Sequence, residues 1–222
     1  MKVEKVVVFD LDDTLYQEID FLKSAYNAIA NKISKLKKVS KGCVYSDMLT
    51  WYNNKENVFK KVLEVYNVDL SVSDLLIMYR NHVPNVFLTP DRLDLLKSLV
   101  NKNIPIGILT DGRSTQQRNK IRALGLESFV KEVLISEEFG SEKPSLRNYK
   151  YFENIYGDAQ YYYIADNLKK DFVTPNELNW ITIRLIDHGQ NIHKNKVTDF
   201  QSNYQAKYEV NSFYEIKALL EL

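Results

Sequence analysis

The first ten residues contain a short apolar strand that runs directly into a cluster of acids. Residues 6–9 read Val-Val-Val-Phe, and Asp10, Asp12 and Asp13 follow them. A continuous apolar run of this kind is typical of a parallel strand that is covered on both faces. In open α/β sheets, the carboxyl ends of such strands form the ligand-binding edge. The pattern therefore predicts an acidic site at the end of a buried strand, with an acidic turn as the simpler alternative.

Strand-like and helical patterns alternate in the second part of the chain. After Pro84, short apolar runs are separated by segments with helical periodicity, and the strands are expected at residues 104–109, 133–135, 161–165 and 180–185. Helices of this length between strands indicate parallel βαβ units with right-handed crossovers. We therefore expect an α/β fold with a Rossmann-like, doubly wound parallel sheet. Residues 190–208 show no periodicity and are expected to be irregular.

The stretch between the first strand and Pro84 has a different pattern. Apolar residues recur at helical spacing from about residue 18 to residue 79, with no strand-like run between them, and Ser71 and Asp74 form a capping-box pattern. This pattern predicts a small all-helical domain inserted after the first strand. We expect a helical cap at residues 17–84 and a catalytic core made of residues 1–16 and 85–222.

The composition excludes several classes of protein. The 222 residues carry 30 Lys and Arg against 29 Asp and Glu, a formal net charge of +1. Neither a nucleic-acid partner nor a membrane surface is indicated by this balance. No signal peptide or membrane span is apparent, and the single cysteine, Cys43, excludes an internal disulfide. We expect a cytoplasmic protein, a monomer or homodimer, in which Cys43 simply packs.

Polar residues follow four of the predicted strands. Because the carboxyl ends of parallel strands meet at one edge, these residues are expected to converge on one site. Several carboxylates in close quarters repel one another unless a cation lies among them, and Mg²⁺ prefers such oxygen ligands. A lysine and a hydroxyl group supply the positive charge and hydrogen-bond donors that a phosphate requires. The residues concerned are Asp10, Asp12, Asp13, Thr14, Thr110, Asp111, Lys143, Asp166 and Asp171.

The order of these residues resembles the four motifs of the haloacid dehalogenase superfamily of aspartate-nucleophile phosphohydrolases. The first motif is matched by Asp10-x-Asp12-x-Thr14, the second by Thr110, the third by Lys143-Pro144, and the fourth by Asp166 with Asp171. The resemblance covers nearly the whole chain and is weakest over residues 190–208. It implies the subgroup of this family in which a helical cap follows the first motif.

The resemblance implies a role for each acid. Asp10 is the expected nucleophile, which forms an aspartyl-phosphate. Asp12 is the expected general acid and base, and its backbone carbonyl is expected to contact the metal. The carboxylates of Asp10 and Asp166 complete the expected Mg²⁺ site. Asp171 is expected to support the site by orienting Lys143 or a metal-bound water.

The same resemblance implies how the phosphate is held. Thr110 is expected to hydrogen-bond a phosphoryl oxygen, with help from the backbone amide of Asp111. Lys143 is expected to neutralise charge on Asp10 and on the transferring group. Two residues depart from the commoner family pattern: Ala165 stands where glycine is frequent, and Asp111 adds a negative charge where asparagine is frequent.

These observations favour a Mg²⁺-dependent phosphatase that acts on a small phosphorylated metabolite. A phosphotransferase or a sugar phosphomutase would retain the same residues, so both remain alternatives. A metal-independent dehalogenase fits less well because Asp12, Asp166 and Asp171 are present, and a non-catalytic binding protein would usually have lost an ionisable group. The cap is expected to select the substrate. For single polar residues there, such as Asn53 and Lys55, solvent exposure is the simpler interpretation.

Overall fold

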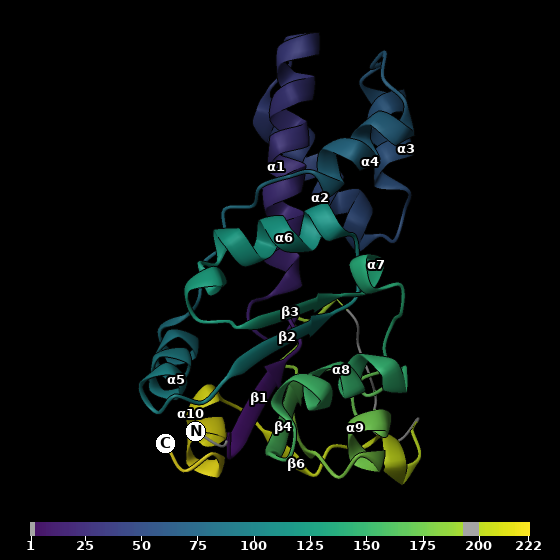
Figure 1. Ribbon diagram of the computed structural model, residues 1–222. Coiled ribbons are helices and arrows are strands. Elements are labelled where there is room, and N and C mark those ends of the chain that lie inside the picture. The colour runs from purple at the N-terminus through teal and green to yellow at the C-terminus, as the bar shows by residue number, and fades with distance from the viewer. Residues whose placement is uncertain (1–2, 193–199) are drawn as a thin grey trace.

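The computed structural model describes residues 3–192 and 200–222 (Figure 1). Its centre is a six-stranded sheet with the order β3-β2-β1-β4-β5-β6, in which every neighbouring pair is parallel. The predicted doubly wound parallel sheet is therefore confirmed. The strands are β1 (Lys5–Phe9), β2 (Ile106–Thr110), β3 (Glu132–Ile135), β4 (Gln160–Ala165), β5 (Ile181–Leu185) and β6 (Tyr208–Val210).

The first strand lies in the middle of the sheet. Val8 of β1 aligns with Gly107 of β2 on one side and with Tyr163 of β4 on the other. The chain builds outward from β1 to β3, then crosses back to β4 and builds outward to β6. The direction of winding thus reverses between β1 and β4. In open α/β sheets, a crevice forms at such a reversal beyond the carboxyl ends of the strands.

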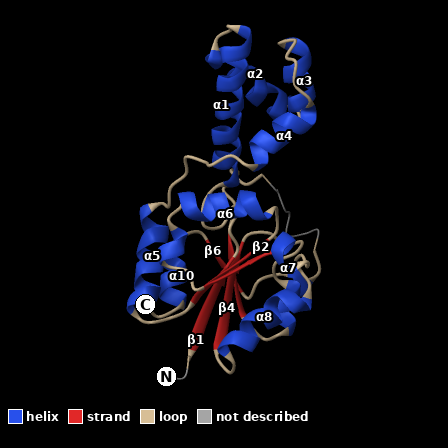
Figure 2. Ribbon diagram, turned by 45° about the horizontal axis from the view of Figure 1, so that its top comes forward, coloured by secondary structure: helices blue, strands red, loops and turns tan. Residues whose placement is uncertain are grey.

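Helices cover both faces of the sheet, as Figure 2 shows. On one face, α5 (Pro90–Asn101), α6 (Ser114–Ala123) and α10 (Phe213–Leu219) pack on an apolar cluster that includes Val7 and Phe9. On the other face, α8 (Leu146–Tyr156) packs on a cluster that includes Val6 and Val8. Alternate side chains of β1 therefore pack against the helices on opposite faces of the sheet, as the period of a strand requires. This arrangement explains why the run from residue 6 to residue 9 is apolar throughout.

Four helices lie between β1 and the core helix α5: α1 (Glu18–Lys37), α2 (Lys41–Asn53), α3 (Val58–Val65) and α4 (Val72–Arg80). We call residues 18–80 the helical insertion. It extends away from one end of the sheet in Figure 1 and has its own apolar cluster, which includes Ile33 and Met48. Ser71 and Asp74 form the predicted capping box at the start of α4. The insertion is thus helical throughout, as expected.

Three details differ from the expectations. Strand β6 ends the stretch that was expected to be irregular; of that stretch, residues 193–199 lie outside the described residues. A helix was expected to stop at Pro175, but α9 runs from Val173 to Glu177. Proline is tolerated in a first helical turn because the backbone N–H groups there have no intrahelical partner. Cys43 was expected to pack, but it is exposed on α2.

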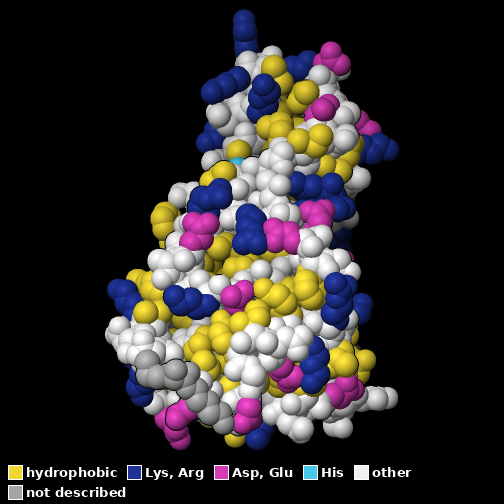
Figure 3. Space-filling view, in the orientation of Figure 1, with side chains coloured by type: hydrophobic (Ala, Val, Ile, Leu, Met, Phe, Trp, Pro, Cys, Tyr) yellow, Lys and Arg dark blue, Asp and Glu magenta, His cyan; other side chains and the backbone are white. Residues whose placement is uncertain are grey.

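The surface carries mixed charges. Figure 3 shows basic and acidic side chains interspersed on the face that it presents. A continuous basic surface, which nucleic-acid binding uses, is therefore missing from this face. Among the described residues, no helix combines the length and the apolar character needed to cross a bilayer.

Candidate active site

The predicted site residues gather at the carboxyl end of the central strands. Asp10 follows β1 directly, and its backbone N–H donates to the carbonyl of Ile164 in β4 at 2.9 Å. Thr110 is the last residue of β2, and Asp166 follows the last residue of β4. All three side chains are buried. The strand ends therefore bring these three residues to the point where the winding of the sheet reverses.

Lys143 lies at the centre of the group. Its Nζ is 2.8 Å from Oδ1 of Asp10 and 2.7 Å from Oδ1 of Asp171, and its side chain is completely buried. Burial alone lowers the pKa of Lys143, but the two carboxylates outweigh burial and raise it well above its usual value. The ammonium group therefore stays charged, and a buried lysine of this kind requires such partners. Asp171 contacts Lys143 directly, and its role in orienting Lys143 stays a prediction.

Three buried acids form a candidate metal site. Among the described residues, Asp10, Asp166 and Asp171 each place a carboxylate oxygen within 4.8 Å of the others. Burial and the neighbouring acids raise the pKa of Asp166 to about 9. Burial also raises the pKa of Asp10 to about 6, although Lys143 opposes the shift. One ammonium group thus does not balance the three acids, and a hard divalent cation would supply the missing positive charge.

The hydrogen bonds distinguish the three acids. Both oxygens of Asp171 are engaged, because Oδ1 binds Lys143 and Oδ2 accepts from the backbone N–H of Asn167 at 3.0 Å. Oδ2 of Asp166 accepts from Nδ2 of Asn191 at 2.8 Å. The donor set therefore fits a magnesium ion held by Asp10 and Asp166, with Asp171 occupied in holding Lys143. Oxygen ligands of this kind, completed by water, are what Mg²⁺ prefers.

The hydroxyl group of Thr110 can donate a hydrogen bond to a ligand. The amide Nε2 of Gln117 lies 2.6 Å from the Thr110 hydroxyl oxygen. Because the amide is the donor in this contact, the hydroxyl proton remains available for another acceptor. A phosphoryl oxygen beside Thr110 is an acceptor of that kind. Gln117 is thus a residue of the site that the sequence analysis missed.

The negative charge of Asp111 is paired. Its Oδ1 accepts from the backbone N–H of Lys143 at 3.0 Å, and its Oδ2 lies 3.1 Å from Nζ of Lys170. The negative charge that Asp111 adds, where asparagine is frequent in the family, is therefore paired with the ammonium group of Lys170. Lys170 also acts electrostatically on Asp10, whose pKa it lowers. The sequence analysis did not single out Lys170.

Asp12 points to a different set of partners. Its Oδ1 accepts hydrogen bonds from the Tyr16 hydroxyl and from Nζ of Lys120, the latter at 2.6 Å, and its Oδ2 accepts from Gln117 at 2.8 Å. Burial raises the pKa of Asp12, but Lys120 and the hydrogen bonds outweigh burial and lower it. Asp12 is therefore a carboxylate in this state. Its neighbour Asp13 accepts from two backbone N–H groups, of Glu18 and Ile192.

Several of these partners gave no clear signal in the sequence. Gln117 and Lys120 are three residues apart on α6, which places them on one helical face. Because α6 is a predominantly polar helix, a buried polar face cannot be distinguished there from a solvated one. Asn191 lies in the stretch without periodicity. Lys120 can be recognised as a buried residue only once the packing of α6 on the sheet is known.

A cavity of about 750 Å³ lies between the helical insertion and the loop that carries Asn191. Asn191, which bonds to Asp166, lines it together with Gln190 from the same loop. The helical insertion contributes further lining residues: Ile19, Asp20, Lys23, Tyr52, Asn53, Lys55 and Glu56. Asn53 and Lys55 are exposed, as the simpler interpretation predicted, and they also line this cavity. The cavity places polar side chains of the insertion opposite the loop at residues 189–192.

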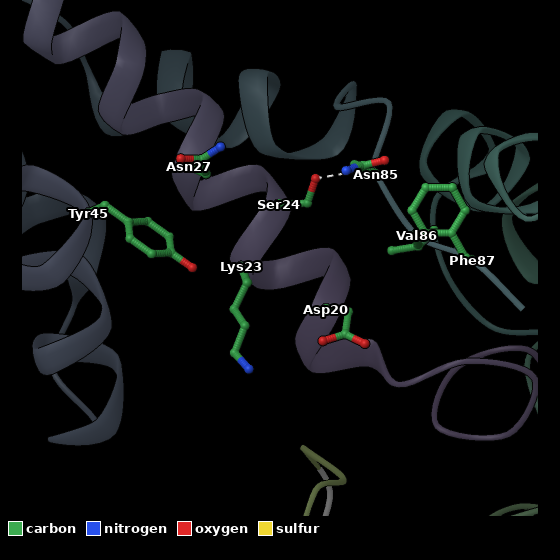
Figure 4. Close-up of a pocket in the computed structure, with 8 residues that line it drawn as sticks. All are labelled: Asp20, Lys23, Ser24, Asn27, Tyr45, Asn85, Val86 and Phe87. Atoms are coloured by element: carbon green, nitrogen blue, oxygen red, sulfur yellow. Dashed lines mark hydrogen bonds between the residues drawn. The ribbon is translucent and has the colours of Figure 1, made fainter. Parts of the chain in front are cut away.

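A second cavity, of about 440 Å³, is shown in Figure 4. Residues of α1, Tyr45 of α2 and the segment 85–87 line it. The hydroxyl of Ser24 accepts there from the backbone N–H of Asn85 at 3.0 Å. None of the predicted site residues lines either cavity, but Asn191 hydrogen-bonds to Asp166, so the cavity beside Asn191 is the candidate substrate site.

Comparison with known proteins identifies the class. The sequence model of the haloacid dehalogenase-like hydrolases matches residues 7–175. The chain belongs to this family, as the motifs indicated.

Three curated relatives illustrate the likeness. A glyceraldehyde 3-phosphate phosphatase of Methanocaldococcus jannaschii is 28% identical over 96% of this chain and 95% of its own. A glyceraldehyde 3-phosphate phosphatase of Methanothermobacter thermautotrophicus is 30% identical over 64% of this chain and 67% of its own. A ribulose-1,5-bisphosphate 5-phosphatase of Halopiger xanaduensis is 33% identical over 39% of this chain and 38% of its own.

Solved structures share the fold. A phosphatase of this family from Thermococcus onnurineus has a TM-score of 0.58 at 22% identity and covers 97% of both chains. A magnesium-bound putative hydrolase of this family from Bacillus subtilis has a TM-score of 0.65 at 18% identity and covers 100% of both chains. At these identities the likeness establishes the fold alone.

Proposed function

We propose that the protein is a Mg²⁺-dependent phosphatase that hydrolyses a small phosphomonoester through an aspartyl-phosphate. The contact between Asp10 and the buried ammonium group of Lys143, at 2.8 Å, carries this proposal. It places a positive charge beside a carboxylate at the carboxyl end of the central strands. A carboxylate in this setting can approach a phosphoryl group that carries the same sign of charge, because Lys143 reduces the repulsion.

In the first step, an oxygen of Asp10 attacks phosphorus and the bond from phosphorus to the ester oxygen breaks. Thr110 donates its hydroxyl proton in a hydrogen bond to a phosphoryl oxygen, and the backbone amide of Asp111 assists. Lys143 stabilises the charge on Asp10 and on the transferring group. A magnesium ion held by Asp10, Asp166 and the backbone carbonyl of Asp12 would neutralise further phosphoryl charge.

Asp12 handles the protons in both steps. Because Asp12 is a carboxylate before the reaction, it first takes up a proton from water when the substrate binds, and it then gives that proton to the departing ester oxygen, which leaves as an alcohol. It then takes a proton from the water that attacks the phosphorus of the aspartyl-phosphate, which releases inorganic phosphate and restores Asp10. The contacts to Lys120, Tyr16 and Gln117 leave Asp12 as the base that the second step needs.

A short sugar phosphate is the proposed class of substrate, with glyceraldehyde 3-phosphate as the first candidate. Two kinds of observation support it. Full-length relatives carry the name glyceraldehyde 3-phosphate phosphatase. The cavity beside Asn191 is lined by amide and charged side chains, among them Asn53, Lys55 and Gln190. Such groups suit the hydroxyl and carbonyl oxygens of a small sugar better than an apolar leaving group.

The test is a screen of phosphometabolites with and without Mg²⁺, run beside the Asp10→Asn variant. We expect the wild type to release phosphate from small sugar phosphates only with Mg²⁺, and the variant to lose at least about 10³-fold in kcat/KM. A phosphotransferase or a phosphomutase would instead move the phosphoryl group to a second sugar. Hydrolysis that persists in Asp10→Asn, or that is absent for every ester, contradicts the proposal.

A further inference from the structure

Lys120 is a buried cation that the catalytic roles above do not use. It lies within α6, in the layer that covers the sheet, and its side chain is only 1% exposed. Burial of an ammonium group is costly unless partners compensate for the lost water. A lysine at this position therefore needs partners that compensate for the lost hydration of its ammonium group.

The ammonium group of Lys120 lies between Asp12 and the start of the helical insertion. Nζ is 2.6 Å from Oδ1 of Asp12 and 3.9 Å from a carboxylate oxygen of Glu18. It also lies 4.7 Å from the ring centre of Phe21 and 5.9 Å from that of Tyr16, distances at which a cation is attracted to an aromatic face. These rings surround the stem and the ammonium group with apolar surface. The closest anionic partner of Lys120 is therefore Asp12.

Asp12 is held from three sides. Lys120 and the Tyr16 hydroxyl donate to Oδ1, and the Gln117 amide donates to Oδ2. We call Tyr16, Gln117 and Lys120 the Asp12 clamp. Two of its members come from α6 and one from the loop after β1, so the carboxylate is fixed between two elements of the core. Gln117 also contacts the Thr110 hydroxyl, which ties the clamp to the proposed phosphate site.

We infer that Lys120, with Tyr16 and Gln117, is a positioning residue that holds the Asp12 carboxylate in line with the leaving oxygen of the substrate. The inference rests on the proposed function and goes beyond it, because it assigns a task to residues outside the four motifs. Lys120 acts through Asp12 and does not touch the substrate. Proton transfer requires the two oxygens to approach within hydrogen-bond distance, so a carboxylate that rotates freely transfers its proton less often.

The test compares two esters that differ in how much they need a proton. Glyceraldehyde 3-phosphate releases a poor leaving group that must be protonated, whereas p-nitrophenyl phosphate releases a stable phenolate that needs little help. The parameter is kcat/KM, because it reports the steps up to formation of the aspartyl-phosphate. For Lys120→Met we expect a loss of about 10²-fold with glyceraldehyde 3-phosphate and less than about fivefold with p-nitrophenyl phosphate.

Two controls separate positioning from general damage. Leu220→Ala opens a cavity in the core at the opposite end of the sheet, near Lys5, and is expected to lower both values of kcat/KM by the same factor. In an Asp12→Asn background, Lys120→Met is expected to add less than about threefold, because two residues that act as a unit are not additive. Tyr16→Phe, which keeps the ring and removes one donor, tests the clamp if Lys120→Met does not fold.

The outcomes are distinct. A selective loss with glyceraldehyde 3-phosphate in Lys120→Met, or a smaller selective loss in Tyr16→Phe, supports the inference. Equal losses with both esters overturn it, as does an unchanged kcat/KM for glyceraldehyde 3-phosphate; in both cases the wild-type activity keeps the proposed function intact. A wild type that hydrolyses neither ester contradicts the proposed function, and the inference falls with it.

Discussion

At the scale of single residues, the site depends on one buried lysine among acids. Lys143 contacts Asp10 and Asp171 at 2.8 and 2.7 Å, and none of these groups has appreciable access to water. Removing one partner of a buried ion pair leaves an uncompensated charge. The electrostatic arrangement that serves phosphoryl transfer therefore also contributes to the stability of the fold.

Lys143→Met tests this double role. We expect it to abolish activity and to lower the free energy of unfolding of the metal-free protein by about 3 kcal/mol, because Asp10 and Asp171 lose their cation. Urea denaturation measures the change. Adding Asp171→Asn is expected to recover part of the loss, since it removes one of the stranded charges. Lys169→Met, at an exposed neighbouring position, is the matched control; equal stability of Lys143→Met and the wild type would contradict the account.

The pair of Asp111 and Lys170 leads to a second prediction. The Asp111 carboxylate lies beside the proposed phosphate site and holds Nζ of Lys170 at 3.1 Å. Asp111→Asn keeps an oxygen for the backbone N–H of Lys143 but removes the negative charge, so Lys170 becomes available to an anion. We expect the inhibition constant of inorganic phosphate to fall by about fivefold in Asp111→Asn, or ~1 kcal/mol.

The complementary variant is Lys170→Met, for which we expect the inhibition constant of phosphate to rise by a similar factor. Steady-state inhibition measured at fixed Mg²⁺ gives both values. Lys169→Met again serves as the control, because Lys169 is exposed. Tighter phosphate binding in Lys170→Met, or no change in either variant, would show that Lys170 does not face the bound anion.

The sequence predicted the residues that follow strands and missed those that act from helices. Asp10, Thr110 and Asp166 were recognisable because each ends an apolar run, and the topology of a parallel sheet then brings them together. Gln117 and Lys120 gave no such signal, because α6 is polar on most of its surface and periodicity does not show which polar face is buried. Their roles depend on tertiary packing.

At the scale of elements, two opposing effects act on the charge of the acid at the start of α1: the helix dipole favours the charge, whereas burial and a neighbouring acid disfavour it. Glu18 is the first residue of α1, where a helix dipole favours negative charge. Burial and the nearby Asp12 nevertheless raise its pKa to about 8, although Lys120 opposes the shift. The folded protein thus binds a proton at Glu18 more tightly than the unfolded chain does.

The pH dependence of Glu18→Gln follows from this shift. Between the unfolded pKa of 4.5 and the folded pKa of about 8, the wild type loses stability at Glu18 as the pH rises. The stability of the glutamine variant does not change in this way, so the variant is expected to gain about 4 kcal/mol relative to the wild type between pH 5 and pH 8.5. Urea titrations at several pH values measure the difference, with the exposed Glu64→Gln as the control. A difference that does not vary with pH would contradict the shift.

The element order was largely predictable, and the exceptions have physical causes. Strand β6 has only three residues and is mostly exposed, so it lacks the apolar run that marks β1. The loop at residues 187–192 is built by hydrogen bonds: the Asp187 carboxylate accepts from the backbone N–H groups of Gly189, Gln190 and Asn191. Such a loop has no periodic signature, which is why Asn191 was not found.

At the scale of the whole molecule, the helical insertion extends away from the end of the sheet where the acids lie (Figure 1), and the cavity beside Asn191 lies between the insertion and the loop at residues 189–192. Burial, together with the neighbouring carboxylates, raises the pKa of Asp10 and Asp166 when no metal is bound, so their charged forms are unfavourable without a cation. A divalent cation that binds only the folded state should therefore stabilise the entire protein.

We expect Mg²⁺ at about 100 times its dissociation constant to add ~2.7 kcal/mol of stability, equivalent to a rise in Tm of about 5 to 10 °C. Thermal unfolding followed by circular dichroism measures the shift. Asp166→Asn should lose most of it because a proposed ligand is gone, whereas Asp69→Asn, at an exposed position between α3 and α4, should keep it. An equal shift in Asp166→Asn would place the metal elsewhere.

The central claim is that Asp10 becomes phosphorylated during turnover. The most direct measurement is a rapid acid quench during hydrolysis of a sugar phosphate, followed by reduction with tritiated borohydride, which converts an aspartyl-phosphate into labelled homoserine with release of phosphate, and by mass spectrometry of the peptides. The account predicts that the label is found on Asp10 alone, that it forms only with Mg²⁺, and that it is absent from Asp10→Asn. A label on any other residue, or a phosphorylated Asp10→Asn protein, would contradict it.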